Sequence, residues 1–181
     1  MPLTKNTAGH MYALTVFTPV IADRLSRLEA TLANLPRRPS PVARLGATHF
    51  ARFVIVPDFV SDASQPAPES LPSPYLLFSA TFDGTLDGYL NDLCRELAAE
   101  AQEIWGCCMG APQPACGTAL KAYLQHNQIQ TGLFFSAYPD ADVATVTAAL
   151  SLRAQTIALA IRGQGMAPEE LRQAFLAEFP R

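Results

Sequence analysis

Charged side chains are scarce in this chain. Lysine, arginine, aspartate and glutamate together make up 16% of its 181 residues, whereas apolar residues make up 49%. The net charge is -3 and the basic residues are scattered, so the chain lacks the basic stripe that binding to nucleic-acid phosphates requires. A surface with so little charge is typical of a protein that covers part of itself with a second copy. The composition therefore argues against nucleic acid as the main partner and favours a homodimer.

Long uninterrupted apolar runs are also missing. No run reaches the roughly 18 residues that a membrane span needs. Residues 11–22 are apolar enough to suggest a secretory signal, but Thr15, Thr18 and Pro19 interrupt them, and a strand followed by a helix is the better interpretation. We therefore expect no membrane partner and a cytoplasmic location.

Cysteines are few and closely spaced, at Cys94, Cys107, Cys108 and Cys116. They lack the two separated CxxC-like pairs of a zinc site. The adjacent Cys107 and Cys108 leave two alternatives open with Cys116, a disulfide or a metal site. Packed structural thiols are the favoured interpretation, and Cys94 is expected to pack on a helix face.

The chain has a length typical of one domain, which we expect to span residues 1–181. Residues 76–83 are echoed by residues 133–140, and an amphipathic helix pattern follows each copy, which indicates a duplicated supersecondary unit. Period-two and period-3.6 patterns predict strands over residues 11–17, 48–56, 75–81 and 131–137, and helices over residues 21–35, 86–105, 116–127, 143–161 and from 168 onwards.

This order of elements predicts an α+β fold of the ferredoxin-like, split βαβ kind. Its four-stranded antiparallel sheet would carry helices on one face, with extra helices at the C-terminus. A small doubly wound parallel sheet is the alternative. Residues 58–74 contain four prolines among serines and acids, so we expect a mobile loop there, either a tolerated insertion or a lid.

The second strand carries a cation among apolar side chains. Because successive side chains alternate between the faces of a strand, Arg52 should share a face with Phe50 and Val54, opposite His49 and Phe53. A cation in such a strand needs an anionic partner. That partner is either an internal carboxylate or the carboxylate of a ligand. The internal candidates are Asp83, Asp87 and Asp140.

The face of the sheet without helices is the natural place for a ligand. There Arg52 would hold an anionic group, His49 would donate a hydrogen bond, and Phe53 and Phe134 would line the pocket. Ser79 and Ser136 occupy matching positions in the two echoed segments and could face a shared cavity. Neither serine has an evident general base beside it, which disfavours a serine hydrolase.

Four blocks, at residues 49–53, 82–84, 104–112 and 137–141, resemble a group of largely uncharacterised bacterial proteins. The resemblance covers about residues 12–152 and implies a ferredoxin-like domain of the dimeric α+β barrel kind, with no established activity. More distantly, residues 84–88 are similar to the GxxDG motif of the dye-decolorising haem peroxidases. That similarity implies a haem cofactor, with Asp87 as the distal acid and Arg52 polarising the bound peroxide.

We therefore consider three functions, given in order of preference. The first is a homodimer that binds a small, partly apolar and possibly anionic molecule at the open face of the sheet. The second is a haem-dependent peroxidase-like oxidoreductase. The third is a structural or assembly module without a small-molecule site. The sequence leaves open whether the protein is an enzyme.

Overall fold

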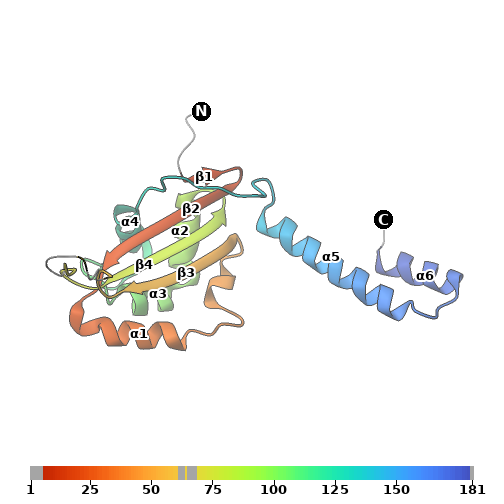
Figure 1. Ribbon diagram of the computed structural model, residues 1–181, viewed down its shortest axis with the longest axis horizontal. Helices are drawn as coiled ribbons and strands as arrows, with labels where there is room; N and C mark the ends of the chain where they lie inside the picture. The colour runs from red at the N-terminus through yellow and green to blue at the C-terminus, as the bar shows by residue number, and fades with distance from the viewer. Residues whose placement is uncertain (1–5, 61–63, 65–68, 180–181) are drawn as a thin grey trace. The chain divides into compact units, whose positions relative to one another are not determined.

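The computed structural model describes residues 6–60, 64 and 69–179 (Figure 1). These residues fall into two compact units, Met1–Asp140 and Ala141–Arg181, where the sequence predicted one domain. We call them the sheet unit and the hairpin unit. The sheet unit contains all four described strands and four of the six described α-helices, whereas the hairpin unit contains the other two helices.

The sheet consists of β1 (Thr7–Ala8), β2 (Met11–Pro19), β3 (Thr48–Val56) and β4 (Tyr75–Asp83), in the spatial order β1-β2-β4-β3. Every pair of neighbouring strands is antiparallel, which rules out the parallel alternative. The three long strands confirm three of the four predicted strands. They are rich in β-branched and aromatic residues, which suit a pleated, half-buried surface.

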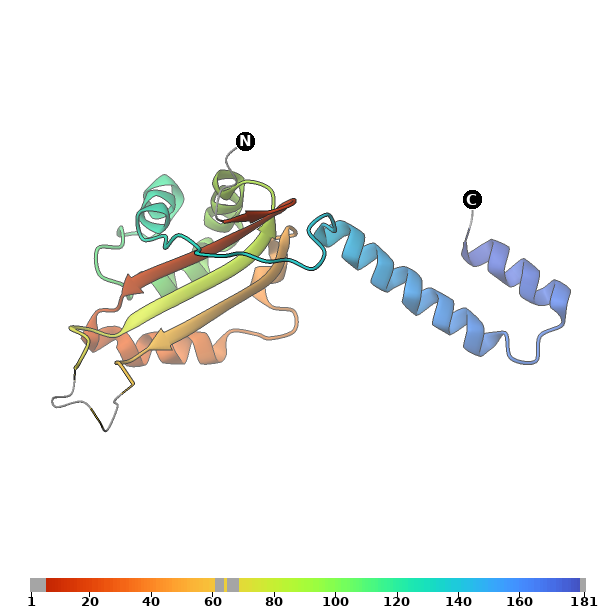
Figure 2. The ribbon, with the colours of Figure 1, turned by 45° about the horizontal axis from the view of Figure 1, so that its top comes forward.

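Helices cover one face of this sheet (Figure 2). They are α1 (Leu25–Asn34), α2 (Leu86–Glu96), α3 (Ala98–Trp105) and α4 (Gly117–His126), joined by the short 3-10 turns η1 (Ala22–Arg24) and η2 (Pro41–Arg44). Alternate residues of β2 and β4 point into this layer and are almost completely buried, because side chains alternate along a strand. Leu14, Val16, Leu76, Phe78 and Phe82 are among them.

Two helix boundaries differ from the prediction. Thr18 and Pro19 do not begin the first helix but end β2, and the helical turn starts at Ala22. The Thr18 hydroxyl is buried and donates to the Leu76 carbonyl at 3.4 Å, so it supports the sheet rather than a helix N-terminus. The long helix predicted over residues 86–105 is two helices that meet at Leu97.

The predicted fourth strand over residues 131–137 is wrong, because this segment forms neither strand nor helix. The outer edge of β2 is already occupied. Ala13 donates to the Asn6 carbonyl at 2.8 Å, Ile129 donates to the Thr15 carbonyl at 2.8 Å, and Phe17 donates to the Asn127 carbonyl at 3.1 Å. With these groups paired, residues 131–137 find no free edge to join. The sheet is still four-stranded and antiparallel, because β1 takes the place of the predicted fourth strand. The ferredoxin-like strand order is not confirmed.

The predicted loop over residues 58–74 lies partly outside the described residues. Its described part contains no helix or strand. The Asp58 carboxylate joins the two ends of the loop, because it accepts hydrogen bonds from the backbone amides of Phe59 at 2.8 Å and Leu71 at 2.7 Å. These amide hydrogen bonds lower the pKa of Asp58.

The hairpin unit contains α5 (Val143–Arg162) and α6 (Pro168–Glu178), which confirm the two helices predicted there. The Asp142 side chain caps α5 by accepting from the Thr145 amide at 2.6 Å. Among the described helices, α5 alone is long and apolar enough to cross a membrane by length and composition, with a mean hydropathy of 1.4. A search for uninterrupted apolar runs misses it because threonine, serine, arginine and glutamine interrupt the helix.

The packing of the sheet against its helices predicts that two phenylalanines contribute very differently to the free energy of unfolding. Phe78 is 1% exposed and packs against Trp105, whereas Phe135 is 80% exposed. We expect Phe78→Ala to lower the free energy of unfolding by about 3–5 kcal/mol, because it leaves a cavity in the core. We expect Phe135→Ala to change it by less than about 0.5 kcal/mol. Urea denaturation measures both, and equal losses would contradict this assignment of the core.

Candidate functional site

The face of the sheet opposite the helices carries Arg52 and Ser79, two of the residues that the sequence singled out. We call it the open face, because no helix of the sheet unit covers it (Figure 2). Phe50 is 79% exposed on β3 and Val54 is 41% exposed two rows further along. Arg52 lies between them and is also exposed. Their neighbours on β2 and β4 in the same rows are Ala13, Thr15, Phe17, Leu77, Ser79 and Thr81.

Arg52 is placed on the open face as predicted, directly opposite Ser79. Among the described residues it forms no ion pair with a carboxylate. Asp83 is four residues beyond Ser79 along β4, which corresponds to about 13 Å. Asp87, the second internal candidate, pairs with Lys121. The guanidinium therefore stands among apolar and hydroxyl side chains with its charge available to another molecule.

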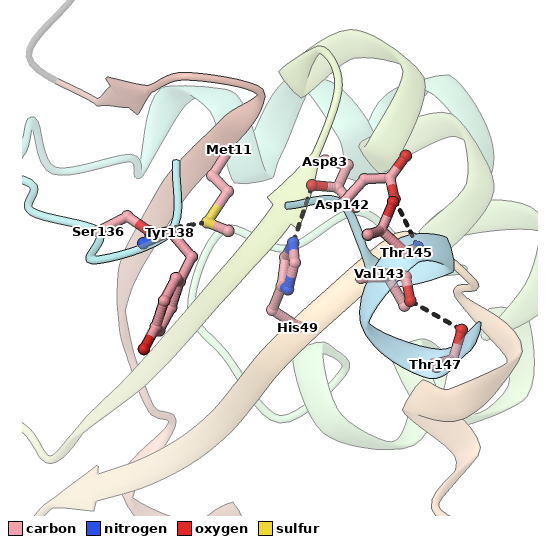
Figure 3. Close-up of polar contacts among 9 residues, drawn as sticks. All are labelled: Met11, His49, Asp83, Ser136, Tyr138, Asp142, Val143, Thr145 and Thr147. Carbon is pink, nitrogen blue, oxygen red and sulfur yellow. Dashed lines mark hydrogen bonds and ion pairs between the residues drawn. The ribbon is translucent and has the colours of Figure 1, made fainter. Parts of the chain in front are cut away.

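His49 does not follow the simple alternation of side chains that the sequence predicted along β3. The register shifts between Thr48 and Phe50, so the strand contains a bulge at His49. A bulge re-aims a side chain by inserting an extra residue. The His49 ring consequently reaches Asp83, with 2.8 Å between Nε2 and Oδ1 (Figure 3). Simple alternation along the strand could not reveal this pair.

Phe53 does not lie on the open face. Its ring stacks on Phe78 at a centroid distance of 4.8 Å and meets the edge of Trp105 at 5.8 Å, within the core beneath the helices. The prediction that Phe53 lines a pocket together with Arg52 is therefore corrected, because neighbouring residues of a strand project to opposite faces.

Ser136 and Phe134 belong to the segment that follows α4. The Ser136 hydroxyl donates to the Met11 sulfur at 3.4 Å and accepts from the Tyr138 amide at 3.3 Å (Figure 3). Met11 is opposite Asp83 in the sheet, so Ser136 lies near the end of β4, four residues along the strand from Ser79. No described cavity is lined by both serines. Phe134 is half-buried.

Asp87 belongs to the helical layer. It lies in the first turn of α2, where the helix dipole favours a carboxylate, and it pairs with Lys121 of α4 at 2.5 Å. Arg52 is on the opposite face of the sheet from these helices. The two residues that the peroxidase resemblance assigns to one site are therefore separated by the sheet.

Sequence reasoning missed a groove on the helical side. A cavity of about 830 Å³ opens between α1, η2 and α3, and its walls combine small side chains and prolines with two arginines and two glutamates. Arg44 and Glu100 form an ion pair of 2.6 Å at its edge. Burial is the largest single influence on the pKa of Glu100 and raises it, but the hydrogen bond from Arg44, a backbone hydrogen bond and the charge of Arg44 together outweigh burial, so the pKa lies below its usual value. The cluster of prolines at residues 36–41 was the signal in the sequence for a rigid wall here.

All four cysteines are free thiols. Cys107 and Cys108 are buried, and the Cys108 sulfur is a second acceptor, at 3.4 Å, for the Thr18 hydroxyl that also lies 3.4 Å from the Leu76 carbonyl. Burial raises the pKa of Cys108 to about 11, and it also raises the pKa values of Cys94 and Cys107. Within the described part of the chain, no three histidine, cysteine or acidic side chains gather closely enough to hold a metal ion.

Comparison of the chain with protein-family models, with curated proteins and with solved structures gave no significant match. Function is therefore argued from the side chains themselves.

The environment of Cys108 predicts slow alkylation. Because burial holds its pKa near 11, only about one thiol in a thousand is ionised at pH 8, and the thiolate is the nucleophile. We expect iodoacetamide to modify Cys116, which is partly exposed, at least about tenfold faster than Cys108 in the folded protein. Mass spectrometry of peptides resolves the two sites. Equal rates that persist in folded protein would contradict the burial of Cys108.

Proposed function

We propose that the chain forms a homodimer through its open face and that Arg52 binds the anionic group of a small, partly apolar molecule there. In this proposal the sheets of two copies stack as in a dimeric α+β barrel, and the sheet unit has the ferredoxin-like arrangement that the sequence predicted. The observation that carries it is a row of exposed apolar side chains with an arginine at its centre, on a sheet face that the unit's own helices leave uncovered.

The apolar character of the open face supports the dimer. Antiparallel sheets that present one face to water usually alternate apolar and polar residues, with the polar ones outside. Here Phe50 and Val54 are on the outer side, beside the half-buried Phe17 and Leu77. Two such faces can pack about 10 Å apart with their side chains interleaved. Exposed apolar area of this kind is typical of an interface.

The charge of Arg52 supports a ligand within that interface. Stacking two open faces would remove two guanidinium groups from water, and buried charges need partners. Asp83, the described carboxylate of this face, already contacts His49. A carboxylate or phosphate from a small molecule would neutralise Arg52 in a bidentate pair, and the surrounding apolar side chains would accept its hydrocarbon part. Ser79 lies opposite and offers a hydroxyl to the same anion.

Two other functions remain distinct from this one. A structural module would use the same interface without a ligand, and binding experiments on Arg52 separate the two. For a haem-dependent peroxidase, no described contact brings Arg52 and Asp87 together, so we do not propose that activity.

The interface predicts a strong effect of charge at Phe50. We expect Phe50→Asp to weaken self-association at least about 100-fold, because it places a carboxylate in each half of an apolar contact. Phe59→Asp is the matched control, since Phe59 is 54% exposed in the loop after β3. It should leave the dissociation constant unchanged. Sedimentation equilibrium gives both constants, and equal behaviour of the two variants would refute the interface.

The proposed anion site predicts that substituting Arg52 removes the extra stabilisation by an anionic ligand. We expect octanoate to raise the melting temperature of the protein and octanol to have a smaller effect, because the alcohol lacks the charge that pairs with the guanidinium. In Arg52→Gln the advantage of octanoate should disappear while the protein stays folded. An unchanged preference for octanoate in this variant would show that Arg52 is not the anion site. A variant that melts early without ligand would make Arg52 a structural residue.

A further inference from the structure

We propose that the hairpin unit is a second self-association surface, in which α5 and α6 of one copy pack against the same hairpin of another copy to form a four-helix bundle. This contact is separate from the open face of the sheet and does not depend on it. It assigns a function to the most apolar helix of the chain, which the sheet unit leaves unexplained.

The first argument is the unpaired stripe on α5. Val146, Leu150, Ile157 and Ile161 follow one another at spacings of four, seven and four residues, so they share one side of the helix. All four are exposed, with exposed fractions between 40% and 65%. In a 20-residue helix of about 30 Å this stripe runs along almost the whole length.

The second argument is where α6 lies on α5. Thr156, Leu159 and Ala160 of α5 line a shallow groove with residues of α6, and Leu159 is the buried residue of α5. These positions are roughly a third of a turn away from the exposed stripe. A helix with a single neighbour needs one apolar stripe. In a four-helix bundle each helix contacts two neighbours, which requires a wider apolar surface such as this one.

The groove between the two helices also indicates that the hairpin is incomplete alone. Its volume is about 490 Å³, and its other wall is formed by Leu171 and Phe175 of α6 and by Phe179, which follows that helix. Furthermore, α6 has 11 residues and α5 has 20, so α6 is too short to cover α5 along its whole length.

The exposed apolar area matches what a stable dimer requires. Nine large apolar side chains of the hairpin unit are between 37% and 65% exposed: Val146, Leu150, Leu152, Ile157, Ile161, Met166, Leu171, Phe175 and Leu176. Side chains of this size and exposure present an apolar area on the order of the roughly 800 Å² that each partner of a standard interface buries.

The charges of the hairpin favour a second copy over a lipid bilayer. Arg162 pairs with Glu178 at 2.7 Å and Arg172 pairs with Glu169 at 3.0 Å, so two copies would meet with little repulsion. Arg153 lies halfway along α5, where a charge in a bilayer core would be costly. Arg153 follows Leu150 by three residues and precedes Ile157 by four, so it lies beside the stripe, and its long side chain would have to extend along the helix to reach water in a bundle.

The experiment uses the full chain and two matched double variants. Leu150→Gln with Ile157→Gln removes two apolar side chains from the stripe, whereas Ser151→Gln with Ala158→Gln changes two exposed positions about 100° around α5 from the stripe. Glutamine is a good helix former, so both variants preserve helix propensity. We expect the stripe variant to self-associate at least about 100-fold more weakly than the control variant in sedimentation equilibrium. Leu150→Met with Ile157→Leu should retain the association, because it keeps the apolar volume.

The outcomes separate this inference from the sheet-face interface. If Phe50→Asp weakens association and the stripe variant does not, the hairpin inference is overturned and the proposed function stands. If the stripe variant weakens association and Phe50→Asp does not, the proposed sheet-face interface is overturned and the hairpin inference stands. Wild-type protein that stays monomeric and co-sediments with phosphatidylcholine vesicles, with binding lost in the stripe variant, would assign the stripe to a membrane and overturn the second-copy assignment. Circular dichroism confirms that each variant keeps its helices.

Discussion

Covering only one face of the sheet is the constraint on which the rest of the sheet unit depends. The helices α1 to α4 bury the alternate side chains of β2 and β4, such as Leu14 and Phe78. Period-two alternation then fixes the composition of the other face, because each buried residue is followed by one that points away from the helices. Phe50 and Arg52 are exposed on that face because Ala51 between them packs toward the core. The open face is thus a consequence of how the core is built.

The outer edge of β2 is covered by other segments of the chain. Unpaired strand edges invite association with other chains, and proteins commonly block them. Here Thr7–Ala8 and the segment around Gln128 both pair with β2, although they are distant in sequence. Their hydrogen bonds occupy the edge that a fourth long strand would need. Self-association through this edge of β2 is therefore blocked, whereas β3 is the strand at the other edge of the sheet.

Sequence patterns predicted the helices and strands that are determined by their own residues. The apolar periods gave three long strands and the helices near Leu93, Leu124 and Leu159, as well as the position of Arg52. They failed where competition between distant segments decides the outcome. The echo of residues 76–83 in residues 133–140 resembles a strand, yet the edge it would join is taken. The bulge that turns His49 toward Asp83 depends on pairing with β4, which no single segment encodes. Phe53 illustrates a different error, because alternation already placed it opposite Arg52.

The exposed apolar surfaces of the two units together explain why the chain has few charged residues. Each unit exposes an apolar surface, the open face around Phe50 in one and the α5 stripe around Leu150 in the other. Contacts on two linked units reinforce each other, since forming one raises the effective concentration for the other. Neither surface then needs to be large or strongly apolar on its own. Modest surfaces also limit the hazard that a single extensive apolar patch would create during folding. In the dimer that we propose, two weak contacts would account for both the composition and the division of the chain.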